Sequence, residues 1–341
     1  MDQIDLKQKP EENKLDQTLA ELGESELINR LGKFMDFGQI NDDTAVIKNP
    51  NKDLLINTDV LVENVHFSTQ TSSPESIGWK AITTNLSDLI SSGAIEFISF
   101  SVGLIAPPQT EWKWIEGVYQ GMQNALNEFG GKISGGDCSQ GHEKILAITA
   151  IGELGALRLH RSNAKPGDYL VASGPHGLSR LGLALLTAQS LENFQELPTS
   201  LKEMAIEAHQ RPSPQIKLLK HLTECKPKDL PMRAAGTDSS DGLLKAVQNI
   251  CFSSKCQAVL FKRDLPQPDY WPKGSPWDEW CINGGEDYEI ILSLPPSWAN
   301  SLIKTMPNIK KIGLIKEGLS QVLWDNGKEI NMKKYPEYKH F

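Results

Sequence analysis

The sequence predicts two mixed α/β units in tandem, and three observations lead to this fold class. The chain has 341 residues, which is enough for two domains with sizeable cores. Up to residue 153, helix caps and strand alternation give the order helix, two strands, helix, strand, helix, two strands, which fits an α+β sheet covered by helices. Beyond that residue, short apolar strands are interspersed with helical segments, as in an α/β unit.

The expected domain boundary lies near Gly152 to Gly155. An N-terminal domain would then cover residues 23–153 and a C-terminal domain residues 154–341. Residues 1–22 lack an apolar core and are rich in Asp, Glu, Lys and Gln, which predicts a disordered tail rather than a signal or transit peptide.

The elements of the first unit follow from caps and alternation. A first helix is expected to open at Gly23 and to end near Gly38. Ser72 or Ser73 before Pro74 predicts the start of a second helix, which should run to Ser92 and stop at Gly93. The other expected elements are strands at 45–48, 54–62, 97–105, 132–137 and 145–152 and a helix at 110–129.

The second unit is expected to mix short strands with helices. A short strand after Ala234 should pass through Asp238 to Gly242 into a helix that ends near Ser253. The other expected elements are strands at 169–173, 258–261, 289–294, 311–315 and 321–324 and helices at 178–189, 201–209, 214–222 and 296–306.

The stretch from Ile56 to Phe67 carries the first chemical signal. It has the pattern of a buried strand that runs out into a loop, with Asn57 and Asp59 on one face and His66 where the strand should end. A carboxylate within so apolar a stretch is costly to desolvate unless a cation or hydrogen-bond donors compensate it. Taken alone, the stretch is equally compatible with an edge strand whose Asp59 lies in water.

Composition excludes several classes of protein. The formal net charge of −8 leaves no excess of Lys and Arg to neutralise nucleic-acid phosphates. No apolar run approaches the roughly 20 residues of a membrane helix. The five cysteines form no Cys-x-x-Cys pair, which is typical of free thiols in a reducing compartment and predicts a cytoplasmic protein. If the substrates are phosphorylated anions, metal cations must supply much of the attraction.

Six sites place an acid beside Gly, Ser, Thr or Asn at the end of an expected element. Oxygen ligands of this kind suit Mg²⁺, which takes one or two carboxylates together with waters and substrate phosphates. Each site taken singly also fits a surface turn, and Asp88 fits a solvated helix end, but the recurrence favours a shared site for several metal ions. The sites are Asp42-Asp43, Thr58-Asp59, Asn85/Asp88, Gly136-Asp137, Asp238/Ser240/Asp241 and Glu286-Asp287.

Familiar phosphate-binding and nucleophile motifs are missing. The sequence contains no Gly-x-x-x-x-Gly-Lys-Ser/Thr loop, no Gly-x-Gly-x-x-Gly, no Gly-x-Ser-x-Gly elbow and no His-Glu-x-x-His. The chemistry must therefore come from the acidic sites.

The acidic sites belong to longer motifs whose order resembles one family. The motifs are Asp42-Asp43, Asn57-Thr58-Asp59…His66-Phe67, Lys80-Ala81…Asn85-Leu86-Ser87-Asp88-Leu89, Gly135-Gly136-Asp137, Arg161-Ser162-x-Ala164-Lys165-Pro166-Gly167-Asp168, Asp238-x-Ser240-Asp241-Gly242 and Gly284-Gly285-Glu286-Asp287-Tyr288-Glu289. From about Gly23 to the C-terminus the chain resembles the thiamine-monophosphate kinases of the aminoimidazole-ribonucleotide-synthetase-like superfamily. This resemblance implies a C-terminal α/β sandwich of that type and a homodimer whose N-terminal sheets pair into a barrel-like core. It also implies transfer of a phosphoryl group from ATP to thiamine monophosphate, giving thiamine diphosphate.

The resemblance also implies a role for each matching residue. The implied Mg²⁺ ligands are Asp43, Asn57, Thr58, Asp59, Asp88, Asp137, Asp238 and Asp241. The implied ATP contacts are Gly136, Asp137, Arg161 and Ser240, and the implied substrate contacts are His66, Glu286 and Tyr338. Asn57 stands where the family usually has Ser, so a metal bond from its side chain does not follow from the pattern. The N-terminal tail has no counterpart in the family.

The expected mechanism is direct in-line transfer without a general base, in which the phosphate of thiamine monophosphate attacks the γ-phosphorus of ATP. Two alternatives stay open from sequence. One is an amide-activating, ligase-type ATP user of the same superfamily, and the other is a non-catalytic Mg-nucleotide-binding protein.

Overall fold

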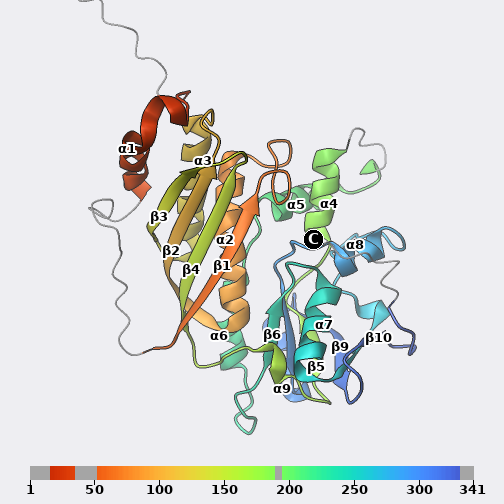
Figure 1. Ribbon diagram of the computed structural model, residues 1–341. Helices are drawn as coiled ribbons and strands as arrows, with labels where there is room; N and C mark the ends of the chain where they lie inside the picture. Colours follow the sequence, from red (N-terminus) through yellow and green to blue (C-terminus); the bar gives the residue numbers. More distant parts are fainter. Residues whose placement is uncertain (1–15, 35–51, 189–193, 331–341) are drawn as a thin grey trace, which may run out of the picture.

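The computed structural model describes residues 16–34, 52–188 and 194–330, and it places the two expected units side by side (Figure 1). The expected strand at 45–48 and the candidate residues Asp42, Asp43 and Tyr338 lie outside the described residues.

The first unit is a four-stranded sheet in the order β1-β4-β2-β3. β4 is antiparallel to both β1 and β2, whereas β2 and β3 are parallel. Helices α2 (Pro74–Ser92) and α3 (Trp112–Phe129) cover one face of the sheet (Figure 1). The strands are β1 (Leu54–Val62), β2 (Ala94–Ala106), β3 (Ile133–Gln140) and β4 (Ile145–Leu154).

Helix α2 forms as its caps predict. Ser73 is the N-cap, and its side chain accepts a hydrogen bond from the backbone N–H of Ser76. Gly93 ends the helix in the left-handed conformation, with φ of 107°. Gly78 lets α3 approach closely, because a Cβ there would lie 1.8 Å from the carbonyl oxygen of Val118. The helix that carries Asn85 and Asp88 therefore packs closely against α3.

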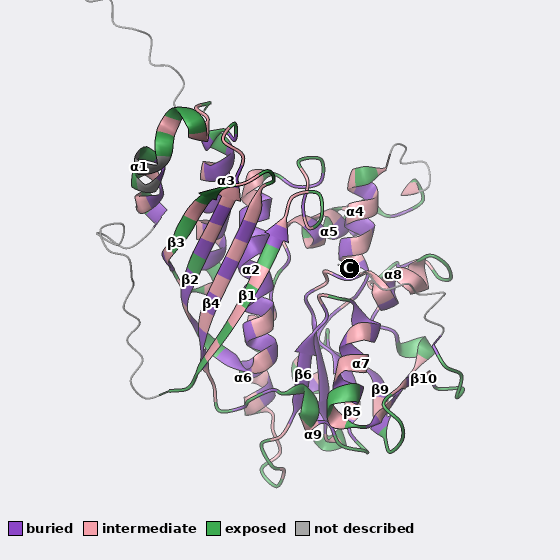
Figure 2. Ribbon diagram, in the orientation of Figure 1, coloured by how far each residue is buried: buried purple, intermediate pink, exposed green. Residues whose placement is uncertain are grey.

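The other face of the first sheet is largely uncovered, and this corrects the prediction of a buried strand at residues 54–62. β1 is an edge strand, and Leu54, Ile56 and Val60 are exposed on this face (Figure 2). Asn57 and Asp59 alternate with them and are half-buried on the side of α2. Alternation identified the two faces correctly, but the apolar face is the one without cover in the single chain.

The first helix also begins earlier than predicted. α1 runs from Leu19 to Leu31, with a kink at Gly23, where φ is 70°. A 3-10 helix, η1 (Gly32–Phe34), follows it. The segment is anchored because the backbone of Thr18 pairs with that of Glu111. Residues 18–22, which were expected to belong to the tail, are therefore part of the fold.

The second unit is a six-stranded mixed sheet in the order β10-β7-β9-β5-β8-β6. Its strands are β5 (Tyr169–Ala172), β6 (Ala235–Asp238), β7 (Gln257–Leu260), β8 (Ile290–Leu294), β9 (Lys310–Lys316) and β10 (Val322–Trp324). Its helices are α4 (Leu178–Thr187), α5 (Thr199–Gln210), α6 (Ile216–Glu224), α7 (Leu243–Ser254), α8 (Trp277–Asn283) and α9 (Pro296–Thr305), with 3-10 helices η3 (Arg161–Asn163) and η5 (Lys262–Asp264). Only α8 and the 3-10 helices lack a counterpart among the elements expected from sequence.

One apolar core joins the two units. α7 and α8 pack on one face of the second sheet, whereas side chains of α6 and α9 join a core that continues into α2, α3 and the first sheet. α2 also contacts β6 directly. The polar side chains of α2, β1 and β6 are therefore held at fixed distances. No helix of the described residues is long and apolar enough to cross a membrane.

Candidate active site between the two units

Asn57 joins strand β1 to helix α2 at the start of the candidate site. Its Nδ2 donates hydrogen bonds to Oδ1 of Asn85 and to Oδ2 of Asp88, each at 3.1 Å. Asn85 and Asp88 lie three positions apart on α2, and they share a face as the spacing predicts. Asp59 lies two residues after Asn57 on the same face of β1, and its carboxylate interacts with that of Asp88.

Asp238 brings the second unit to the same place. It ends β6 and is buried, and its carboxylate accepts hydrogen bonds from Oγ of Ser87 and Oγ of Ser240, each at 3.2 Å. Because Ser87 neighbours Asp88 on α2, the helix holds acids of both units together. Asp241 is exposed just beyond β6, and its charge acts on Asp88.

Burial and mutual repulsion disfavour the charged forms of Asp59, Asp88 and Asp238. Burial and the neighbouring Asp88 raise the pKa of Asp59 to about 6. The same two causes raise the pKa of Asp238 to about 7, against the opposing effect of its hydrogen bonds to Ser240 and Ser87. Burial is also the main cause of the raised pKa of Asp88, which Asn57 and Arg161 partly offset. A cation bound beside these acids would relieve their mutual repulsion.

The donor set fits Mg²⁺. Oδ1 of Asn57 is buried and has no hydrogen-bond partner among the described residues, although it lies beside these carboxylates. Among the described residues, no group of three or more His, Cys, Asp or Glu side chains could hold a metal ion by itself. Mg²⁺ tolerates this arrangement because it completes its octahedral shell with waters and substrate phosphates.

Arg161 lies at the edge of the acidic cluster. It is the first residue of η3, and its Nε donates a hydrogen bond of 2.9 Å to Oγ1 of Thr237 on β6. Its charge opposes the rise in pKa of both Asp88 and Asp238. Arg161 and Ser240 therefore lie beside the acids that the sequence grouped with them.

Thr58, Gly136 and Asp137 do not join the cluster within one chain. Thr58 points to the opposite face of β1, where its Oγ1 lies 2.8 Å from Oγ1 of Thr149. Gly136 and Asp137 are exposed on β3, which is the edge strand at the far side of the sheet from β1. The expectation that all these residues share one site is not met by the single chain.

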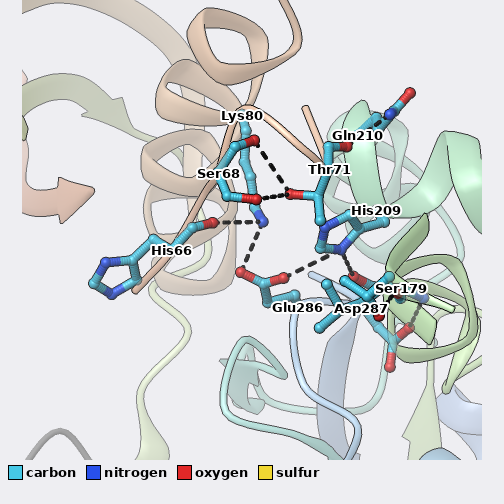
Figure 3. A network of polar contacts seen from close by, with 11 residues as sticks. His66, Ser68, Thr71, Lys80, Ser179, His209, Gln210, Glu286 and Asp287 are labelled. Atoms are coloured by element: carbon cyan, nitrogen blue, oxygen red, sulfur yellow. Dashed lines mark hydrogen bonds and ion pairs between the residues drawn. The ribbon is translucent and has the colours of Figure 1, made fainter. Parts of the chain in front are cut away.

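A second group of polar residues surrounds Glu286 (Figure 3). Nζ of Lys80, on α2, lies 2.7 Å from Oε1 of Glu286, and Nδ1 of His209, on α5, lies 3.5 Å from Oε2. Burial alone would raise the pKa of Glu286, but the Lys80 ammonium, helped by His209 and His66, takes it below its ordinary value. Glu286 is therefore ionised, and 31% of its side chain is exposed to a ligand.

The loop that carries Glu286 has an unusual backbone. Gly285, Glu286 and Tyr288 have φ values of 69°, 55° and 51°, in the left-handed region. The N–H of Glu286 donates a hydrogen bond of 2.7 Å to the carbonyl oxygen of Ser240. Asp287 accepts hydrogen bonds from the backbone N–H groups of Gly177 and Ser179 at the start of α4, at 2.8 and 3.2 Å. The loop is thus hydrogen-bonded to Ser240, just beyond β6, on one side and to the start of α4 on the other.

His66 lies in the loop after β1. Its Nδ1 accepts a hydrogen bond of 3.0 Å from the N–H of Val62, and its ring points away from Lys80 (Figure 3). Its carbonyl oxygen lies 3.5 Å from Nζ of Lys80. The structure therefore connects two of the sequence-predicted substrate contacts, His66 and Glu286, through one lysine.

Sequence reasoning gave no role to Lys80 or His209. Lys80 had a detectable signal, because it is a lone charge among Ile77, Trp79 and Ile82 in an amphipathic helix. His209 had none, since a histidine near a helix end is common. His209 does not form a Ser-His-Glu triad, because it contacts both Ser179 Oγ, at 3.1 Å, and Glu286 through the same ring nitrogen, Nδ1.

The chain is similar to several known proteins. Residues 41–154 match the family model of the AIR synthase related protein, N-terminal domain. The chain is 54% identical to a thiamine-monophosphate kinase of Prochlorococcus marinus, over 97% of this chain and 99% of that protein. It is 37% identical to the thiamine-monophosphate kinase of Synechococcus elongatus, over 89% of this chain and 91% of that protein. The solved structure of AaThiL complexed with AMPPCP and TMP is similar with a TM-score of 0.72 at 29% identity, over 95% of this chain and 99% of that one.

A relative that is 54% identical over nearly the whole of both chains confirms the resemblance, and the chain belongs to the thiamine-monophosphate kinase family.

Proposed function

We propose that this protein transfers the γ-phosphoryl group of ATP to thiamine monophosphate, giving thiamine diphosphate and ADP. The observation that carries the proposal is the placement of ionised Glu286 near an acidic cluster that fits Mg²⁺, in a chain of this family. The two groups are joined by the hydrogen bond between Glu286 and Ser240.

The acids of both units would hold the magnesium. Asp59 and Asp88 from the first unit and Asp238 and Asp241 from the second are the residues for this role, with Asn57 Oδ1 as a neutral ligand. Bound Mg²⁺ would neutralise charge on two polyphosphate groups that otherwise repel each other. Arg161 would clamp a phosphate of ATP from the edge of the cluster, where its guanidinium can donate two parallel hydrogen bonds.

The acceptor needs no general base. The phosphate of thiamine monophosphate is already anionic at neutral pH, so the protein has only to align it with the γ-phosphorus. His209 is unsuited to proton transfer near pH 7, since burial and then the nearby Lys80 charge lower its pKa to about 4. Glu286 would bind the cationic, donor-bearing part of the substrate, and His66 would contact it from the loop after β1.

A homodimer is part of the proposal, and the bare face of the first sheet supports it. Leu54, Ile56 and Val60 on β1 and Ile95 on β2 are exposed, with Ile56 at 69%. An apolar face of this kind usually marks an interface, and a second copy of the sheet would cover it as the expected barrel-like core requires. Gly136 and Asp137 could then reach a site only across that interface.

The five cysteines are free thiols, which supports a reducing compartment and hence the expected cytoplasmic location. The proposed function is tested by incubating the protein with ATP, Mg²⁺ and thiamine monophosphate and following thiamine diphosphate by chromatography. Production of thiamine diphosphate with one ADP per product is the expected result. Binding of ATP without product would instead support a non-catalytic nucleotide-binding protein.

A further inference from the structure

We propose that Lys80 is a positioning residue that holds the His66 loop and the Glu286 turn at the spacing needed to bind the acceptor substrate. This inference rests on the proposed function and adds to it a residue that does not itself touch the substrate. Lys80 is 1% exposed and lies on α2, in the first unit, whereas Glu286 belongs to the second.

The contacts of Lys80 are with the two segments that it would position. Its Nζ donates to Oε1 of Glu286 at 2.7 Å and lies 3.5 Å from the carbonyl oxygen of His66. The same ammonium thus binds a side chain of one segment and the backbone of the other. A buried ammonium costs several kcal/mol of desolvation unless it is paired, so neither contact is given up easily.

The Glu286 turn needs such a partner because its backbone is strained. A non-glycine residue in the left-handed region is strained and is held there by its surroundings. For Glu286 the surroundings include Lys80 on the side chain and the carbonyl oxygen of Ser240 on the N–H. Loss of the ammonium would let the carboxylate swing out and would weaken the turn.

His209 is not a substitute for Lys80. It contacts the other carboxylate oxygen at 3.5 Å, but it is buried beside the charges of Lys80 and Arg180 and stays neutral near pH 7. The next residue on α5, Gln210, donates a hydrogen bond of 2.7 Å to the carbonyl oxygen of Thr71 at the far end of the His66 loop (Figure 3). α5 therefore supports both segments from one side, and Lys80 supplies the charge between them.

The test is steady-state kinetics of Lys80→Met with each substrate varied in turn. The KM for thiamine monophosphate should rise more than about tenfold, which corresponds to 1.4 kcal/mol. The KM for ATP should change less than about twofold, since Lys80 bonds the side chain of Glu286 and the carbonyl oxygen of His66, whereas Ser240 bonds only the backbone N–H of Glu286. An unchanged KM for thiamine monophosphate, or an equal rise of both KM values, would overturn the proposal.

A double-mutant cycle keeps the test valid if Lys80→Met folds poorly. The pair Lys80→Met/Glu286→Gln removes both charges and leaves none unpaired between them, and it should show the same raised KM for thiamine monophosphate as Glu286→Gln. If the two substitutions instead raise the KM for thiamine monophosphate independently, so that their factors multiply in the double variant, Lys80 does not act through Glu286. A wild-type KM in Glu286→Gln would contradict the proposal as well.

A matched control separates positioning from stability. Arg233→Met breaks another buried ion pair, in which Arg233 contacts Asp168 at 2.7 and 2.8 Å at the opposite end of β6 from Asp238. It should lower the Tm and leave the KM for thiamine monophosphate unchanged. If the wild-type protein makes no thiamine diphosphate, the proposed function itself is refuted. If the variants are active and their KM values are unaltered, only the role of Lys80 is refuted.

Discussion

Asn57 on β1 and Asp88 on α2 share a hydrogen bond of 3.1 Å, so a neutral amide stands inside the acidic cluster. The amide donates to a carboxylate and leaves its own Oδ1 buried without a partner among the described residues. Nδ2 therefore relieves charge on Asp88, and Oδ1 is the atom that we propose as a metal ligand.

Asn57→Asp should make the protein depend on Mg²⁺ for stability. The new carboxylate faces Asp88 and removes a donor, which should lower the free energy of unfolding by about 1 to 3 kcal/mol without metal. Saturating Mg²⁺ should restore more stability than in the wild type, because binding to the folded state stabilises it. Thermal melts with and without Mg²⁺ measure both effects. Asn57→Ser is the control, since it loses the same amide donor without adding charge and should gain no Mg²⁺-dependent stability over the wild type.

Asp59→Asn should separate activity from folding. The carboxylate is destabilised by burial and by Asp88, so neutralising it should leave the Tm in metal-free buffer unchanged or slightly higher. Turnover should fall at least about a hundredfold, because loss of a metal ligand removes several kcal/mol of charge stabilisation. Full turnover of the variant at saturating Mg²⁺ would show that Asp59 is not a ligand.

Gly136→Ala should destabilise the sheet whatever its effect on ATP. A Cβ at this position would lie 2.0 Å from the carbonyl oxygen of Val102 on the neighbouring strand, and backbone cannot give way cheaply. The expected loss is about 1 to 3 kcal/mol in the free energy of unfolding, measured by denaturant titration. Gly103→Ala, on the adjacent strand, is the control, because its Cβ would come no closer than 3.3 Å to another atom. Equal stabilities of the two variants would contradict this packing role.

The parts of the fold that could be predicted from sequence are those with local signals. Ser73, Pro74 and Gly93 define α2 because capping and proline geometry act within one turn of the chain. The order of the acidic motifs identified the family for the same reason, since each motif is short and contiguous. Helix α8 was not predicted. It has only seven residues, and Gly274 and Pro276 before it are typical of a turn.

The remainder depends on contacts that no local pattern encodes. Lys80 and Glu286 meet across 206 positions, and sequence shows neither partner. Strand alternation placed Asp59 and Ile56 on opposite faces of β1, but it could not say which face α2 would cover. The single charge of Lys80 next to Trp79 and Ala81 was the one local hint of the buried network.

Glu289→Gln should flatten the pH dependence of stability. Burial raises the pKa of Glu289 from 4.5 to about 8, despite hydrogen bonds from Ser173 and Gln215. Between these two values the folded protein holds a proton that the unfolded chain has lost, so a rise in pH lowers the stability of the wild type. The glutamine variant lacks this titration. Urea unfolding from pH 5 to pH 8 should therefore show the wild type losing stability relative to Glu289→Gln, and parallel curves would contradict the assignment.

Mixing two inactive variants should restore activity if Asp137 reaches the active site from a second copy. Asp59 lies on the edge strand β1 and Asp137 on the opposite edge strand β3, so one chain does not bring them together. In a heterodimer of Asp59→Asn and Asp137→Asn chains, one composite site carries both substitutions and the other carries none. After subunit exchange at equal amounts, half of the dimers are mixed, and roughly a quarter of the wild-type activity should return.

A substitution in the proposed dimer interface supplies the control for this complementation. Ile56→Lys places a charge on the exposed apolar face of β1, where it should prevent association at little cost to the monomer fold. Leu319→Lys, at another exposed apolar residue outside the first sheet, should leave the oligomeric state unchanged. Light scattering after size exclusion gives the mass, and Ile56→Lys introduced into both mixed chains should abolish the regained activity. Activity that returned in monomeric chains would mean that Asp59 and Asp137 act in separate places, so the site would not be shared across copies.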